Sequence, residues 1–107
     1  MEIKKEQKEA LDQFQLLQQQ LQTIAIQKES LKLQTLEIEK ALEELKKTEQ
    51  KEALKIVGNI MVKKSVEELK KELEEDKENL SIRISSLEKV EEKINNKLKE
   101  LQTKLKG

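Results

Sequence analysis

The first half of the chain carries one heptad pattern whose spacing does not change. From Ala10 to Leu45, apolar residues recur at alternating steps of four and three, and only Lys28 and Thr35 interrupt the row. Its members are Ala10, Phe14, Leu17, Leu21, Ile24, Lys28, Leu31, Thr35, Ile38, Leu42 and Leu45. Five heptads with only two polar positions in the seam are typical of a coiled-coil helix. The pattern therefore predicts a first long helix over residues 1–48.

A second heptad row begins at Val66. Its first seam position is apolar without exception, at Val66, Leu73, Leu80, Leu87, Ile94 and Leu101. Its other seam position is weaker, at Leu69, Asp76, Arg83, Val90 and Lys97, while Ile84, Leu98 and Leu105 add an apolar flank beside it. Ser65 followed by Glu68 fits a helix-capping box. We expect a second helix over residues 65–106.

The two rows match each other best when the helices run antiparallel. Pairing Leu45 with Val66 sets an apolar residue against an apolar residue in every such layer as far as Ala10 and Leu101. In the alternate layers Thr35 faces Asp76, and Lys28 faces Arg83, a like-charge layer whose side chains we expect to reach outward to water. The matched polar layers favour an intramolecular antiparallel coiled coil over a parallel homodimer.

The heptad period stops between the helices, at residues 52–64. Two short apolar runs there flank the dipeptide Gly58-Asn59, which favours a β-hairpin with a primed turn over a plain loop. Both faces of such a hairpin would be apolar, and both of its edges would be open to further strands. An isolated two-stranded hairpin is marginal in water. The segment therefore predicts a subunit whose hairpin joins hairpins of other chains.

Composition excludes most catalytic chemistry. The 107 residues contain no His and no Cys, and 22 Lys and Arg balance 22 Asp and Glu. Disulfides, His or Cys metal sites and Cys or His nucleophiles are thus excluded, and no glycine-rich phosphate loop is present. We expect no enzyme activity and no cofactor. The single arginine and the zero net charge also argue against nucleic-acid binding.

The sequence shows no membrane or export signal. The first residues are charged and no apolar run follows them, and no segment approaches the 18 apolar residues of a membrane span. A cytoplasmic location is the expectation.

Apolar residues near the two termini are candidates for weak binding. Leu11, Leu98 and Leu105 lie beside the strict seam, whereas Phe14 and Leu101 lie on it. Coiled-coil ends fray, and an accessible apolar strip suits sequence-tolerant binding of apolar segments. The alternative is that these residues are ordinary seam residues, and this alternative is strongest for Phe14 and Leu101.

Three segments resemble the archaeal form of the prefoldin β-subunit family. They are LDQFQLLQQQLQTIAIQKESL, the hairpin segment LKIVGNIMVKK, and the stretch from VEELKKELEE to LEKVEEKINNKLKELQ. The resemblance implies a hexamer of two α and four β subunits, whose hairpins form β-barrels. It also implies that the coiled-coil tips hold unfolded polypeptides without ATP and deliver them to a group II chaperonin. By position, barrel contacts would fall on Leu54, Ile56, Val57, Ile60, Met61 and Val62, and tip contacts on Leu11, Phe14, Leu98, Leu101 and Leu105.

Two other classes of function compete with this reading. A structural coiled-coil scaffold or tether would bind no client, but it would have no need of the apolar hairpin. A nucleic-acid-binding helical arm would need a cluster of guanidinium groups to grip phosphates, and Arg83 is the only arginine in a chain of balanced charge.

Overall fold

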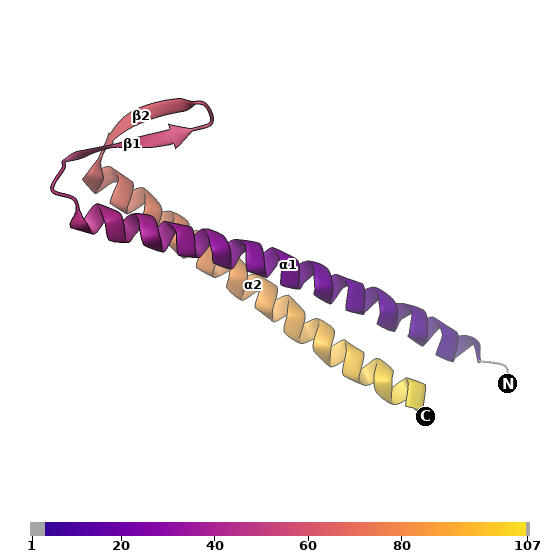
Figure 1. The fold of residues 1–107 in the computed structure, drawn as a ribbon. Coiled ribbons are helices and arrows are strands. Elements are labelled where there is room, and N and C mark those ends of the chain that lie inside the picture. The colour runs from indigo at the N-terminus through magenta and orange to yellow at the C-terminus, as the bar shows by residue number, and fades with distance from the viewer. Residues whose placement is uncertain (1–3, 107) are drawn as a thin grey trace. The chain divides into compact units, whose positions relative to one another are not determined.

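The chain consists of two long helices joined by an antiparallel two-stranded hairpin (Figure 1). The computed structural model describes residues 4–106, so the first three residues of the predicted helix 1–48 lie outside the described range. Helix α1 spans Lys5–Lys47, strand β1 Glu52–Val57, strand β2 Ile60–Ser65 and helix α2 Val66–Lys106. The predicted fold class, a helical hairpin interrupted by a β-hairpin, is confirmed. The barrel expected in an oligomer is a property of several chains and remains a prediction.

The helices contribute to two compact units. The described part of the terminal unit comprises residues 4–30 and 84–106, and the hairpin unit comprises residues 31–83. Each unit combines part of α1 with part of α2, and an ion pair crosses between the helices in each. Lys28 Nζ lies 2.7 Å from Glu91 Oε1 in the terminal unit, and Lys77 Nζ lies 3.5 Å from Glu39 Oε1 in the hairpin unit.

The seam of α1 is the predicted one. All eleven predicted positions from Ala10 to Leu45 are buried or half-buried. The most buried of them are Ala10, Ile24, Leu31 and Leu42. The polar seam residue Thr35 satisfies its hydroxyl within α1, because Oγ1 donates to the carbonyl oxygen of Leu31 at 2.9 Å. The heptad rule therefore describes this helix throughout.

The predicted second seam row of α2 is wrong at Asp76, Arg83 and Val90, which are exposed. Half-buried residues instead occupy the next position along the chain, at Lys77, Ile84, Glu91, Leu98 and Leu105. The physical reason is an irregularity near the start of α2, where Leu69, Leu73 and Lys77 follow one another at two successive steps of four. Such a stutter shifts the seam by one position for the rest of a helix.

The predicted like-charge layer of Lys28 and Arg83 is also wrong. Lys28 donates to Glu91 and lies 4.0 Å from Glu88, and its side chain is only 16% exposed. The hydrogen bond to Glu91 raises the pKa of Lys28 above its ordinary value, in spite of the opposing effect of burial. The seam lysine thus pairs with opposite charge on α2 instead of reaching outward to water.

The hairpin pairs its strands in one register, from Glu52 opposite Ser65 to Val57 opposite Ile60. Gly58 has a φ of 60°, and no other residue in the described range has a positive φ. This φ pattern is that of a type II′ turn, which needs a positive φ only at its first central residue. It matches the primed turn that the Gly-Asn dipeptide predicts.

Backbone and hydroxyl groups anchor the base of the hairpin. The amide of Val66 donates to the carbonyl oxygen of Lys51 at 2.8 Å, which ties the start of α2 to the connector before β1. The hydroxyl oxygen of Ser65 accepts from the amide of Glu68 at 3.1 Å. Ser65 is therefore the N-cap of α2, as the capping pattern predicts.

Candidate functional site

The two faces of the β-hairpin differ in what covers them. Side chains alternate along a strand, and directly paired residues share a face, so the register divides the hairpin into two sets. The lysine face carries Ala53, Lys55, Val57, Ile60, Val62 and Lys64. The free face carries Leu54, Ile56 and Met61, together with Glu52, Lys63 and Ser65.

The lysine face is tied to α2 by Glu72. One carboxylate oxygen of Glu72 lies 3.0 Å from Lys55 Nζ of β1, and the other accepts a hydrogen bond from Lys64 Nζ of β2. The hydrogen bonds from Lys64 and Lys55 lower the pKa of the Glu72 carboxyl below its ordinary value. One side chain on the helix thus holds both strands.

All six predicted assembly residues are solvent-exposed in the single chain. The exposed fraction reaches 68% at Ile56, 66% at Ile60 and 65% at Met61. Leu54, Val57 and Val62 are exposed as well. Within the described residues the sheet has only two strands, so the outer backbone edge of each has no strand partner. A large apolar surface with unpaired edges is suited to binding further strands.

The predicted tip residues lie in the terminal unit and differ in exposure. Leu11 is 39% exposed, Phe14, Leu98 and Leu105 are half-buried, and Leu101 is only 2% exposed. Leu101 is therefore part of the helix–helix core, and Leu11 is the most accessible residue of the set. Their role in binding remains a prediction.

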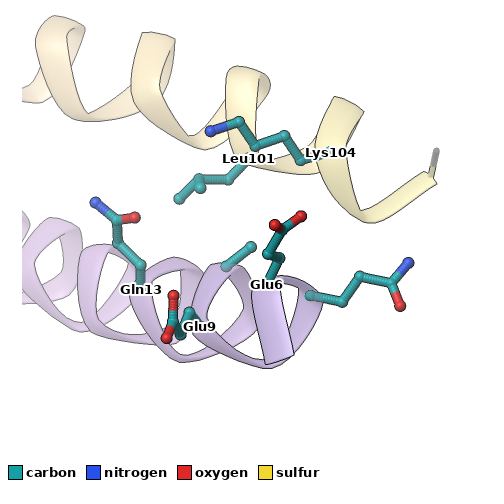
Figure 2. Close-up of a pocket in the computed structure, with 7 residues that line it drawn as sticks. Glu6, Glu9, Gln13, Leu101 and Lys104 are labelled. Carbon is teal, nitrogen blue, oxygen red and sulfur yellow. The ribbon is translucent and has the colours of Figure 1, made fainter. Parts of the chain in front are cut away.

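A largely polar groove lies beside Leu101. Figure 2 shows Glu6, Glu9 and Gln13 on α1 across from Leu101 and Lys104 on α2. The groove has a volume of about 440 Å³, and only Ala10 and Leu101 contribute apolar side chains to its lining. Charged and amide groups thus surround the small apolar floor near the ends of the helices.

A more apolar groove lies further along the terminal unit. It has a volume of about 400 Å³ and is lined by Leu16, Gln19, Gln20, Thr23, Ile24, Val90 and Ile94. Leu16 is 54% exposed and Val90 is 43% exposed. The heptad pattern does not identify Leu16, although an apolar residue directly before the seam residue Leu17 was a usable signal. The same pattern predicts Val90 in the seam because a regular heptad does not contain the stutter in α2.

Neither a cluster of metal-ligating side chains nor a membrane-spanning helix is present between residues 4 and 106. No group of three or more carboxylate, His or Cys side chains lies close enough to hold a metal ion between residues 4 and 106. Neither α1 nor α2, as far as they are described, is long and apolar enough to cross a membrane. What the arrangement offers chemically is apolar contact surface and unpaired strand edges.

These features define a class of coiled-coil protein in which two long helices are joined by an exposed, apolar strand hairpin. The family model described as "Prefoldin subunit" matches residues 8–107. The chain is 42% identical over 96 residues to the prefoldin subunit beta of Thermococcus onnurineus, covering 89% of this chain and 83% of the relative. It is 43% identical over 96 residues to that of Archaeoglobus fulgidus, with the same coverage.

A solved structure agrees in fold. The crystal structure of the prefoldin beta subunit from Thermococcus strain KS-1 superposes with a TM-score of 0.88 at 35% identity, covering 97% of this chain and 92% of that one. The chain belongs to the prefoldin subunit family, and the three relatives named above are archaeal β-type subunits. Membership in this family gives it a chaperone-type role and implies assembly with other prefoldin subunits.

Proposed function

We propose that this chain is the β-type subunit of a hexameric prefoldin of two α and four β subunits. The hairpin residues Leu54, Ile56, Val57, Ile60, Met61 and Val62 enter a shared β-barrel with neighbouring hairpins. The observation that supports this proposal is the exposure of all six residues on a sheet with two unpaired edges. A single chain gains nothing from such a surface, whereas an assembly buries it.

The assembled particle captures unfolded polypeptides in the cytoplasm without ATP or another cofactor, and passes them to a group II chaperonin. Client contacts fall on the terminal unit, at the predicted residues Leu11, Phe14, Leu98 and Leu105, and at the buried Leu101 only when the ends of the helices fray. Leu11 is the most accessible of them, and the exposed pair Leu16 and Val90 adds apolar surface that the same clients can use. Several weak apolar contacts joined by one base gain avidity for a chain that exposes many apolar segments.

The native mass of this chain, alone and co-expressed with an α-type prefoldin subunit, tests the assembly. A two-to-four heterohexamer is the expected result. A monomer or simple dimer under both conditions would overturn the assembly proposal. The sizes are far enough apart for native mass spectrometry to separate them.

Suppression of the aggregation of a denatured model protein tests client capture. Removing residues 1–12 and 99–107 should abolish the suppression while the hexamer still forms. Leu11→Ser is a milder variant, since Leu11 is exposed and its replacement leaves the core intact. Suppression that survives the truncation would show that the client contacts lie elsewhere.

A structural scaffold or tether without client binding is the second candidate. The burial of Leu101 favours this alternative, because it leaves that predicted tip residue little surface for contact with a client. A hexamer that forms but suppresses no aggregation, with or without the truncation, would identify the scaffold.

A further inference from the structure

The hairpin and α2 meet at a single backbone junction. Strand β2 ends at Ser65 and α2 begins at Val66, so no connector residue separates them. The amide of Val66 donates to the carbonyl oxygen of Lys51 at 2.8 Å, which brings the connector before β1 to the same point. Both strands therefore start from one place, and rotation about the φ and ψ dihedrals there would change the angle between the hairpin and α2.

Apolar packing does little to fix that angle. A groove of about 500 Å³ opens where β1 passes the helices, and Ala53 and Leu54 of β1 line it together with Leu69 and Leu73 of α2. Beyond this point all of residues 56–62 are exposed, so the outer half of the hairpin does not pack on a helix. The angle therefore depends on polar contacts at the base of the hairpin.

Glu72 supplies these polar contacts from the second turn of α2. It lies about 9 Å along the helix axis from Val66, at about 1.5 Å per residue. Its two carboxylate oxygens bind the two strands separately, Oε2 at 3.0 Å from Lys55 Nζ of β1 and Oε1 to Lys64 Nζ of β2. Of the ion pairs within residues 4–106, only these two join a strand to a helix.

The two lysines and the junction hold the hairpin at three points. The register places Lys55 and Lys64 on the same face, at diagonal positions of the two strands. Because Glu72 binds both strands, it opposes rotation of the hairpin about its own long axis. Because it binds them away from the junction, it also opposes a swing of the hairpin away from α2. Without the carboxylate, the two ammonium groups would repel each other across the strands.

We propose that Glu72 is a positioning residue for assembly, which fixes the angle between the hairpin and α2 so that the hairpins of several subunits can meet at once. The inference rests on the proposed function, because it assigns to one side chain the preparation of the hairpin for the shared barrel. A hairpin that samples many angles is competent for assembly only part of the time. The apparent dissociation constant then rises by the inverse of the competent fraction.

A distance measurement in the isolated chain tests the angle directly. The chain has no cysteine, so Asn59→Cys in the turn and Glu75→Cys on α2 give two unique sites for spin labels, and both residues are exposed. Dilution with unlabelled chain removes distances between chains. Double electron–electron resonance should give a broader distance distribution after Glu72→Gln. Glu91→Gln is the matched control, since it removes the same charge from the ion pair with Lys28 in the terminal unit, and it should leave the distribution unchanged.

Titration with an α-type subunit, followed by native mass spectrometry, measures the effect on assembly. Glu72→Gln should raise the dissociation constant about threefold to tenfold at low salt, as expected for two partly exposed ion pairs, whereas Glu91→Gln should not. The triple substitution Glu72→Lys, Lys55→Glu and Lys64→Glu reverses all three charges, and it should restore both the distance distribution and the affinity. Far-UV circular dichroism and the urea midpoint of each isolated variant establish that it is folded.

The outcomes separate this inference from the function on which it rests. A wild-type distance distribution or wild-type affinity after Glu72→Gln overturns the positioning role and leaves the hexamer standing. A triple variant that regains the distance distribution but not the affinity shows that these side chains contact the neighbouring subunit directly, and this also overturns the positioning role. If the wild-type chain forms no complex with an α-type subunit, the proposed function itself fails, and the inference fails with it.

Discussion

Replacing Val57 with aspartate should separate folding from assembly. Val57 is 53% exposed in the single chain, so a carboxylate there remains in water. The change in the unfolding free energy should then stay within about 1 kcal/mol, the span of the strand-propensity scale. In a shared barrel the same side chain would be buried, and the carboxylate would have no partner.

The loss of affinity can be worked from the exposed fraction. Full burial of a valine side chain contributes about 1.5–3 kcal/mol, so burying the exposed half contributes about 1 kcal/mol to assembly. Burying an unpaired polar group adds at least about 2 kcal/mol of penalty, and more for a charge. A total of about 3 kcal/mol or more corresponds to a weakening of at least about a hundredfold.

Titration of this chain with an α-type subunit, followed by native mass spectrometry or analytical ultracentrifugation, measures the affinity. Ile26→Asp is the matched control, because it places the same charge at a 72%-exposed apolar residue of α1 in the terminal unit. The control should assemble as the wild type does. Wild-type affinity for a correctly folded Val57→Asp chain would refute burial of the hairpin, and loss of helical structure in that variant would refute the argument from exposure.

Three further predictions concern the fold itself. Leu42→Ala, at a position only 4% exposed, should lower the unfolding free energy in urea by about 2–4 kcal/mol, whereas Leu36→Ala at a 51%-exposed position should change it by about 0.5 kcal/mol or less; equal effects would contradict the seam. Gly58→Ala should destabilise the hairpin by about 1–2 kcal/mol because φ is 60° there, measured as faster amide exchange in both strands, and Gly58→Asn should be milder; unchanged exchange would contradict the turn geometry. Glu72→Gln should lower stability most at neutral pH, because a carboxyl with a lowered pKa stabilises the fold above its unfolded pKa of about 4.3 and loses that contribution as the pH falls through the folded value. Urea unfolding at pH 7 and near pH 3 measures this, and a difference that persists unchanged in acid would exclude titration of Glu72 as its source.

Local rules were sufficient for α1 and for the hairpin. Each seam position of α1 from Ala10 to Leu45 follows the heptad without a shift, so one period describes the whole row. The Gly58-Asn59 dipeptide between apolar runs identified the turn because the required positive φ is a property of one residue. These features depend on neighbours close in the sequence.

The second half of the α2 seam depends on packing that no local rule contains. The residues Leu80, Leu87, Ile94 and Leu101 form a row that is apolar throughout. This row is compatible with a second row of seam residues on either side of it on the helix surface. The apolar Val90 favoured the row that contains Arg83, although the apolar Ile84 and Leu98 favoured the row one position later. Only the partner helix decides between them, and it selects the side that contains Glu91.

The sequence also could not predict which of the tip residues are exposed and which are buried. Leu101 belongs to an unbroken apolar row, and nothing in that row distinguishes a core leucine from an accessible one. The structure buries it to 2% exposure and leaves Leu11 accessible. Side-chain burial at the end of a coiled coil depends on how far the facing helix extends, which is a tertiary property.

The ion pair of Lys28 with Glu91 explains why an antiparallel helix of the same chain suits α1 better than a second copy of α1. In a parallel, in-register pair of α1 helices, Lys28 would face Lys28 within the seam, where like charges repel and have little water around them. Helix α2 instead supplies Glu91 at 2.7 Å, with Glu88 nearby at 4.0 Å. A buried polar position in a seam is best attested as a device that specifies partner and register. Lys28 thus adds little through apolar contact, but it opposes the pairing of two α1 helices and favours the pairing of α1 with α2.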